Sequence, residues 1–312
     1  MSNISFSIIT PCLNRVQYIG AAIESTQNQD YPVFEHIVMD GGSTDGTLDL
    51  LKKYPHLTLV SEPDHGMYDA LNNGIARAQG DIIGLLNSDD MYTRGAFTAV
   101  VEAFEQHPEA EAVVGGVEVF VEDEQGIQIV DTAAAIESGE FWFRIIQGPP
   151  VTNAWFFRRQ VFERMGDFDT RLRWSADRKF LIHITLDGGL RPIPIHKILY
   201  RYRQHSGSAT ITTLDSRDPR YGFTRMKTLQ EDIILLNEFL ERKDLPSEVR
   251  RRLRREHGER CYRLAATAAY HHYGKIAMRA VKTGFSRDLF WSFVFLDMAT
   301  KRLIKEFPGR HG

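Results

Sequence analysis

A short apolar run that ends in two adjacent aspartates constrains this chain more than any other feature. Residues 81–86 (DIIGLL) have the length and boundaries of a buried β-strand, and Asp89 and Asp90 follow shortly after it. In open α/β sheets, ligands bind in the crevice beyond the carboxyl ends of the strands. Two adjacent carboxylates are costly there unless a positive charge neutralises them, and a hard divalent cation carrying a phosphate ligand would do so. A solvated turn is the alternative interpretation.

A second acidic turn, rich in glycine, occurs at an equivalent place earlier in the chain. Residues 36–39 predict a short strand, which runs into residues 40–46 (DGGSTDG). Three glycines allow a tight turn whose backbone N–H groups point at a ligand. An EF-hand loop would need a glutamate where Leu51 stands, and the spacing of a dinucleotide-binding fingerprint is absent. A purely structural turn remains the alternative.

The hydrophobic pattern alternates between strands and helices over the first 130 residues or so. Pro11 is expected to end the first strand, and Asn14 is expected to cap the helix after it. Beyond about Asp131 the pattern is less regular, and helices are predicted again from Tyr221 onwards. Alternating strands and helices predict a mainly parallel sheet covered on both faces. The predicted strands are 5–10, 36–39, 57–61, 81–86, 112–121, 153–157 and 198–202; the predicted helices include 19–26, 48–54, 67–78 and 97–104.

Charge divides the chain into two parts. The 312 residues carry a net charge of -3 and are 43% hydrophobic, which is enough for one large domain or two. Residues 1–221 hold 19 Lys+Arg against 30 Asp+Glu, a balance of -11, whereas residues 222–312 hold 19 against 11, a balance of +8. This asymmetry predicts a catalytic domain over 1–221 and a helical basic segment over 222–312 that faces an anionic surface or packs on the acidic domain.

Cysteine usage and the chain ends indicate a cytoplasmic protein. Cys12 and Cys261 are far apart and form no metal-type spacing, which fits a reducing compartment. The first residues lack the basic region and apolar core of a signal peptide. The apolar run at 289–296 is far shorter than the roughly 20 residues needed to span a bilayer.

A series of motifs occurs in a defined order along the chain: SIITPCLNR, MDGGSTDGT, EPDHGMYDALNNGIARAQGD, LLNSDD, FFRRQVFERMGDFD, an aspartate at 177 and RYRQHSGS. Taken together, these motifs resemble one family, the inverting family 2 glycosyltransferases of the GT-A fold. The resemblance covers about residues 5–210 and depends on the order and spacing of the motifs. It implies an α/β GT-A fold with a central, mainly parallel mixed sheet flanked by helices, and a transferase of the hexosyltransferase type.

The resemblance implies a role for individual residues. Asp89 matches the last aspartate of the D-x-D motif, which binds a metal that bridges the donor's two phosphates, and His205 matches a histidine that completes this site in some relatives. Asp177 matches the general base that deprotonates the acceptor hydroxyl. The implied cofactor is Mn²⁺ or Mg²⁺. Donor contacts are implied at Thr10, Pro11, Asn14, Asp40, Asn72, Ser88 and Asp89, and acceptor contacts at Asn153, Trp155 and Trp174.

The chemistry of glycosyl transfer agrees with these roles. A departing nucleoside diphosphate needs its charge stabilised, and a divalent cation does this as a Lewis acid. A base close to the attacking hydroxyl, opposite the leaving group, gives inversion. The structural alternatives are a helix-terminal carboxylate for Asp177, an exposed histidine for His205 and aromatic packing for Trp155 and Trp174. Arg201 and Arg203 are expected to be surface arginines, or alternatively to contact phosphate.

Two positions depart from the family pattern. Gly41 stands where a second consecutive aspartate, often in contact with the base, is usual, and Asn87 replaces the first aspartate of D-x-D. These departures favour one rival function, a catalytically inactive nucleotide-sugar-binding module. A nucleotidyltransferase is the other rival, although residues 11–15 lack the glycine-rich loop that such enzymes carry.

The arginine cluster at 250–255 has three interpretations. A solvated helix face is the default, contact with an anionic membrane comes second, and nucleic acid is not expected because the remainder of the chain is acidic. The resemblance therefore implies a cytoplasmic enzyme, located at the inner face of the cytoplasmic membrane, that moves sugar from a nucleotide-diphosphate sugar to a glycan or lipid-linked acceptor in polysaccharide biosynthesis.

Overall fold

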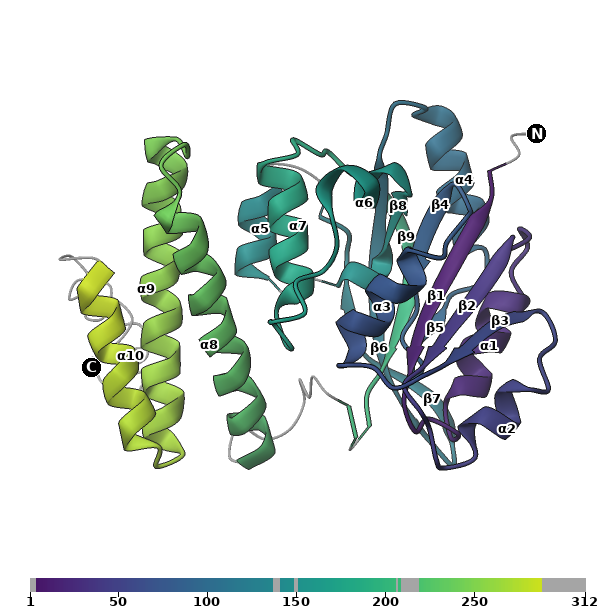
Figure 1. Cartoon of the computed structure of the whole chain (residues 1–312), viewed down its shortest axis with the longest axis horizontal. Coiled ribbons are helices and arrows are strands. Elements are labelled where there is room, and N and C mark those ends of the chain that lie inside the picture. Colours follow the sequence, from purple (N-terminus) through teal and green to yellow (C-terminus); the bar gives the residue numbers. More distant parts are fainter. Residues whose placement is uncertain (1–3, 137–140, 149–150, 206, 209–218, 288–312) are drawn as a thin grey trace, which may run out of the picture. The chain divides into compact units, whose positions relative to one another are not determined.

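The computed structural model describes residues 4–136, 141–148, 151–205, 207–208 and 219–287 (Figure 1). They fall into two compact units, one within residues 1–208 and the other within residues 209–312. Helix α8 of the second unit begins at Pro219, so it starts before the domain boundary predicted at residue 222. The boundary itself stays a prediction.

The first unit is built on one nine-stranded sheet, in the order β3-β2-β1-β4-β8-β6-β9-β5 with β7 paired to β6. Strands β3, β2, β1 and β4 run parallel, β8 lies antiparallel between β4 and β6, and β6 and β9 are again parallel. The sheet is therefore mixed. The strands are β1 (Phe6–Cys12), β2 (Glu35–Asp40), β3 (Leu57–Ser61), β4 (Ile82–Leu85), β5 (Met91–Tyr92), β6 (Ala112–Asp123), β7 (Gly126–Ala133), β8 (Trp155–Arg158) and β9 (Ile193–Arg203).

Helices cover both faces of this sheet, because buried side chains of the central strands alternate between the two faces. Phe6 of β1 stacks on Phe97, so α4 packs on one face together with α1. On the opposite face, Ile9 of β1 lies against Gly74 of α3. The helices of this unit are α1 (Ile19–Gln27), α2 (Thr47–Leu51), α3 (Met67–Ile75), α4 (Ala96–Gln106), α5 (Phe141–Gln147), the 3₁₀ turn η1 (Thr152–Ala154), α6 (Gln160–Met165) and α7 (Ala176–Leu186).

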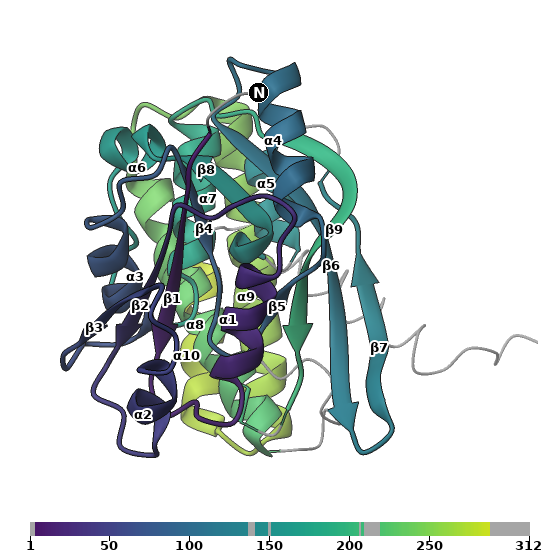
Figure 2. The same cartoon turned by 90° about the vertical axis from the view of Figure 1, so that its right-hand side faces the viewer.

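The predicted sheet with helices on both faces is confirmed, but two local predictions are wrong and one strand was missed. Pro11 does not end the first strand, since β1 continues through it to Cys12. Asn14 does not cap α1, whose N-cap is Tyr18; Asn14 instead adopts a left-handed backbone conformation with φ 53°. Strand β7, which forms a hairpin with β6 at the edge of the sheet (Figure 2), was not predicted.

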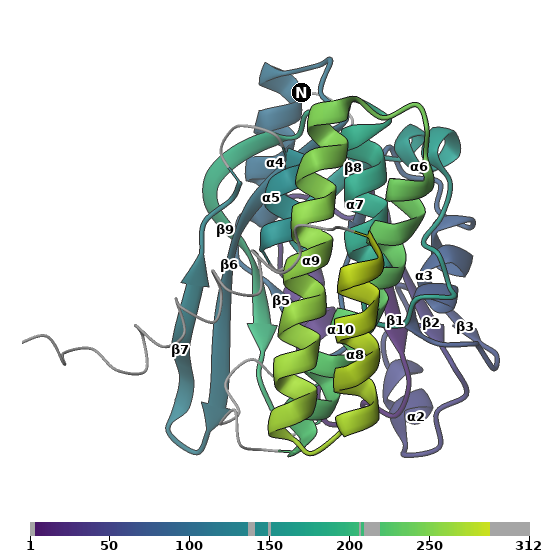
Figure 3. The same ribbon diagram turned by 90° about the vertical axis from the view of Figure 1, so that its left-hand side faces the viewer.

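The described residues of the second unit form three helices that lie side by side, α8 (Pro219–Glu241), α9 (Ser247–Tyr270) and α10 (Gly274–Arg287), with α9 in contact with both others (Figure 3). The buried Arg260 of α9 pairs with Asp232 of α8 at 3.1 Å and with Glu256 at 3.3 Å. In the arginine cluster, Leu253 is buried, and neighbouring arginines pair with glutamates of the same helix. Among the described helices, none has the length and apolar character to cross a membrane.

Candidate active site

Three loops meet at the carboxyl edge of the sheet because their strands are parallel and in register. Cys12 pairs with Asp40, and Ile9 pairs with Leu85, so β1, β2 and β4 end at neighbouring levels. The loop after β1, the glycine-rich loop 41–46 and the loop 86–90 therefore leave the sheet at the same edge. This is the place where open α/β sheets bind ligands.

Asp40 organises the glycine-rich loop. Its buried carboxylate accepts N–H bonds from Gly42 and Ser43 at 3.1 Å, and the hydroxyl of Ser61 donates to it at 2.8 Å. Asn14 joins the same loop from β1, because its side-chain oxygen accepts the Thr44 N–H at 2.8 Å. The predicted donor-site residues Asp40 and Asn14 thus both bind the backbone of the glycine-rich loop.

The side chains at the end of β1 lie beneath these loops. The hydroxyl of Thr10 contacts Nε2 of the buried His36 at 2.9 Å, and Pro11 is also buried. Ser88, another predicted donor-site residue, is buried and lies beside the thiol of Cys12. Burial, and secondly the charge of Asp40, raise the pKa of this thiol to about 12. A thiol with this pKa stays protonated, so Cys12 packs as a small apolar residue.

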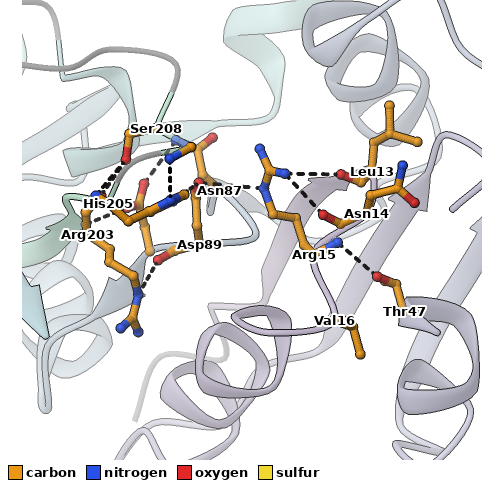
Figure 4. Close-up of polar contacts among 12 residues, drawn as sticks. Leu13, Asn14, Arg15, Val16, Thr47, Asn87, Asp89, Arg203, His205 and Ser208 are labelled. Carbon is orange, nitrogen blue, oxygen red and sulfur yellow. Dashed lines mark hydrogen bonds and ion pairs between the residues drawn. The ribbon is translucent and has the colours of Figure 1, made fainter. Parts of the chain in front are cut away.

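Asp89 and His205, predicted as metal ligands, are in direct contact (Figure 4). The Asp89 Oδ2 atom lies 3.1 Å from His205 Nε2 and 3.7 Å from the Nε of Arg15. The Gly207 N–H donates to the other ring nitrogen of His205 at 3.1 Å, which leaves the ring proton on Nε2 to bond Asp89. The Tyr18 ring packs on the His205 ring with centroids 4.4 Å apart.

Asp90 has a different environment from its neighbour. It is buried, and it accepts bonds from the Tyr200 hydroxyl at 2.6 Å, the Arg203 N–H at 2.7 Å and the Asn87 side-chain N–H at 3.0 Å. Burial, and secondly the charge of Asp89, raise the pKa of Asp90 to about 7. Asp90 therefore holds the loop from inside, whereas Asp89 faces Arg15 and His205 at the carboxyl edge. The side-chain amide of Asn87 is hydrogen-bonded to Asp90.

Two arginines of this site were missed or misjudged from the sequence. The Nη1 atom of Arg15 also donates to the carbonyl oxygens of Leu13 and Asn14. Arg15 is the first basic residue in the chain, and this isolated position was the sequence feature that could have identified it as a site residue. Arg203 was expected at the surface but is 5% exposed; its Nε donates to the Asp89 carbonyl oxygen at 2.9 Å and Nη1 bonds Glu122. Arg201 pairs with Glu118.

Asp177 lies on the first turn of α7, half-buried, and its Oδ1 atom accepts the Arg178 N–H at 2.7 Å. The same turn follows Trp174, whose half-buried ring lies 5.8 Å from the Arg173 guanidinium carbon. Asn153 reaches the end of β4, because its side-chain N–H donates to the Leu85 carbonyl oxygen at 3.3 Å.

Two other predicted residues, Asn72 and Trp155, contact Phe168 and Phe157. The side-chain amide of Asn72 bonds both the carbonyl oxygen and the N–H of Phe168, at 2.8 and 3.0 Å. These two hydrogen bonds attach α3 to the loop that leads into α7. Trp155 is 2% exposed and stacks on Phe157, which is the aromatic packing considered as its alternative.

Among the described residues, Asp89 and His205 are the two predicted metal ligands that the structure brings together. No group of three or more His, Cys, Asp or Glu side chains suited to a metal ion occurs in the described part of the chain. Asp89 and His205 supply one oxygen and one nitrogen within 3.1 Å of each other, which are donor types that Mn²⁺ accepts. Phosphate oxygens and water complete the shell where a cation is bound through few side chains.

Comparison with known proteins identifies the family. The family model described as glycosyl transferase family 2 matches residues 7–166. The chain belongs to this family. The recognition made from its motifs is thereby confirmed, as is the expectation that it is a glycosyltransferase.

Curated and solved relatives agree with this membership. A PGL/p-HBAD biosynthesis glycosyltransferase of Mycobacterium tuberculosis is 27% identical over 208 residues, covering 65% of this transferase and 78% of the relative. The crystal structure of S. aureus TarS 1–349 in complex with UDP-GlcNAc gives a TM-score of 0.56 at 18% identity, covering 96% of this chain and 92% of TarS. The mannosyltransferase PcManGT from Pyrobaculum calidifontis, solved with GDP-Man and Mn²⁺, gives 0.57 at 20% identity, covering 97% and 88%. The GT-A fold expected for this family 2 transferase is confirmed.

Proposed function

We propose that this transferase moves a hexosyl group from a nucleotide-diphosphate sugar to a glycan or lipid-linked acceptor, with inversion at the anomeric carbon. The observation that carries the proposal is the Asp89–His205 pair beside Arg15 at the carboxyl edge. Two fold relatives were solved with such donors, UDP-GlcNAc and GDP-Man. A role in polysaccharide or glycolipid assembly is supported by the names of sequence relatives, among them a putative teichuronic acid biosynthesis glycosyltransferase TuaG of Bacillus subtilis, 36% identical over 93 residues.

Asp89 and His205 would hold the divalent metal, Mn²⁺ or Mg²⁺. When bound, the metal supplies Lewis-acid stabilisation of the departing diphosphate. Binding through Nε2 of His205 requires the ring proton to leave that atom. The positively charged guanidinium of Arg15 lies 3.7 Å from the Asp89 Oδ2 atom, and this charge suits an edge that binds phosphate.

Asp177 is proposed as the general base. It takes the proton of the acceptor hydroxyl while the hydroxyl oxygen bonds to the anomeric carbon and the nucleoside diphosphate leaves from the opposite side. A single displacement of this kind inverts the anomeric centre. The proposal is supported by the half-buried carboxylate on the first turn of α7, where the backbone N–H of Arg178 already orients it.

The other side chains are proposed to shape the donor and acceptor sites. The loop held by Asp40 and Asn14, over Thr10, Pro11 and Ser88, forms the donor wall. Asn153 and Trp174 face the acceptor. Asn72 acts by fixing the loop before α7 rather than by touching the donor, since both halves of its amide bond Phe168.

Exchange of Asp177 for asparagine tests the mechanism. Turnover of UDP-GlcNAc and GDP-mannose, followed as transfer or as hydrolysis with water as acceptor, is expected to fall by about 10²- to 10⁴-fold in Asp177→Asn, with the donor KM little changed. Asp187→Asn makes the same charge change at the other end of α7, where Asp187 pairs with His183, and serves as the control. Turnover in Asp177→Asn within about threefold of the wild type would remove Asp177 from this role. Donor binding without turnover by the wild type would favour the inactive-module alternative.

The second unit is proposed to bring the enzyme to the inner face of the cytoplasmic membrane. On α10 the exposed apolar residues Met278 and Phe285 are seven positions apart, hence on one helical face, and exposed basic residues lie between and beside them. Apolar and cationic side chains together are what an anionic lipid surface binds. An acceptor carried on a lipid would be reached from such a surface.

A further inference from the structure

Gly41 and Asp64 form an unusual pair at the carboxyl edge. A Cβ atom added to Gly41 would lie 2.5 Å from Asp64 Oδ2 and 3.0 Å from its Cγ. The carboxylate of Asp64 therefore fills the space where a side chain at position 41 would begin. Gly41 directly follows Asp40, the last residue of β2, so a carboxylate from a different loop takes the place of a side chain on the glycine-rich loop.

The position of Asp64 is fixed by its own loop, which connects β3 to α3. The Glu62 N–H donates to the Asp40 carbonyl oxygen at 2.9 Å, and Ser61 bonds the Asp40 carboxylate, so this loop is attached to the end of β2. Asp64 Oδ1 accepts the Gly66 N–H at 2.8 Å. Within the described residues Oδ2 has no hydrogen-bond partner, although the residue is half-buried.

A half-buried carboxylate with one open oxygen is an acceptor only, so the ligand group that it selects must be a donor. Uracil, thymine and guanine present a ring N–H at the edge that pairs with another base, whereas cytosine and adenine present a ring nitrogen lone pair there. A carboxylate that faces the ring nitrogen of that edge accepts a hydrogen bond from the first group, whereas it is repelled by the lone pair that the second group presents there. Sites built to bond one polar group reject ligands that lack it far more strongly than they reject a change of size.

We infer that Asp64 reads the base of the nucleotide donor in place of the side chain that Gly41 lacks, and that it selects a nucleoside diphosphate with a ring N–H, of the uridine, thymidine or guanosine class. This inference rests on the proposed function, because it needs a nucleotide at this edge. It names Asp64 as a specificity-determining residue.

Calorimetric titration of the full chain with UDP, GDP, CDP and ADP, in the presence of Mn²⁺, tests the inference. The wild type is expected to bind UDP or GDP more tightly than CDP and ADP. Asp64→Asn keeps an oxygen for the Gly66 N–H but removes the charge, and it is expected to weaken the preferred nucleotide by about tenfold or more and to reduce the difference between bases. Glu62→Gln, the same change at an exposed carboxylate of the same loop, is the matched control and should bind within about twofold of the wild type.

Moving the carboxylate gives an independent check. Gly41→Asp alone should lose binding, because its side chain meets Asp64, whereas Gly41→Asp combined with Asp64→Ala should restore the preference for UDP or GDP. Unchanged binding in Asp64→Asn would overturn the inference while the proposed function stands. Equal weakening of all four nucleotides would also overturn it, since that result indicates contact with the ribose or a role in loop shape. A wild type that binds none of the four would overturn both.

Discussion

Asp89 and Asp90 are neighbours in the chain, yet the fold gives them opposite surroundings. Asp89 faces Arg15 and His205, while Asp90 is enclosed by Tyr200, Asn87 and the Arg203 backbone. The strand end that carries them could be predicted from the apolar run before it. The apolar pattern does not show which of the two is enclosed, because that depends on Tyr200 and Arg203, which lie more than a hundred residues further along the chain; the choice of Asp89 as the metal ligand came from the family resemblance.

The same limit applies to other residues of the site. The pairing of Asp89 with His205 was predicted only through the family resemblance, since 116 positions separate them. Trp155 is an aromatic residue in an extended segment, and the pattern does not say which sheet face it occupies. In the structure, it lies in the core against Phe157.

His36 supports a prediction about pH. Burial lowers its pKa to about 3, so the ring stays neutral in the native state while the unfolded chain takes up a proton below about pH 6.5. The unfolded state then binds more protons, and stability should fall as the pH drops from about 6.5 towards 3, by up to about 1.4 kcal/mol per pH unit. Urea unfolding between pH 7 and 4.5 measures this slope.

His36→Gln should flatten that slope, and His107→Gln, at a half-buried position, should leave it as in the wild type. An equal slope in wild type and His36→Gln would mean that another group governs acid sensitivity.

At the level of elements, the periodicity of buried side chains predicted most strands and helices of the first 130 residues or so. Strand β7 was missed because all but its first residue are exposed, which leaves no burial pattern to read. Pro11 fits inside β1 for a reason of register. The pairing of β1 with β4 stops at Ile9, so Pro11 lies beyond the reach of that strand on the side where its missing N–H would point.

Close packing of α3 on β1 gives a prediction for Gly74. A Cβ atom at this position would lie 2.4 Å from Cγ2 of Ile9 and 3.2 Å from Cγ of Met39. Gly74→Ala should therefore destabilise the protein by about 1–3 kcal/mol despite the better helix propensity of alanine. Urea unfolding followed by circular dichroism measures the change.

Gly20→Ala in α1 is the matched control, because its added Cβ would meet nothing closer than the Tyr54 hydroxyl at 3.4 Å. It should be neutral or stabilising. A Gly74→Ala protein as stable as Gly20→Ala would contradict the packing described for α3.

At the scale of the whole molecule, the charge balance of -11 over residues 1–221 and +8 over residues 222–312 parallels the two compact units. The charge balance predicted two regions, and the spacing of apolar residues predicted helices in the second. For the arginine cluster of that region, a solvated helix face was the default interpretation and contact with an anionic membrane the second.

Binding of the full chain to vesicles separates these possibilities. Vesicles with about a third anionic lipid should bind the wild type, and added salt should weaken the binding. Lys275→Glu/Arg279→Glu on the exposed face of α10 should reduce affinity by about tenfold or more, since each basic residue near the surface contributes about 1 kcal/mol. Sedimentation with the vesicles measures it.

Lys52→Glu/Lys53→Glu makes the same charge change on exposed residues of the first unit and should bind as the wild type does. Similar losses in both double variants would indicate a general effect of charge rather than a membrane-binding face on α10.

The measurement closest to the central claim is the melting temperature of the protein with UDP-, GDP-, dTDP- and CMP-compounds, with and without Mn²⁺. A nucleotide that binds the native state stabilises it by about 2.7 kcal/mol at a hundred times its Kd. We expect one nucleotide class to raise the melting temperature only with Mn²⁺, in the wild type and in the exposed control Asp49→Ala but not in Asp89→Ala. A rise that persists in Asp89→Ala, or no rise with any nucleotide, would contradict a metal-dependent donor site at this edge of the sheet.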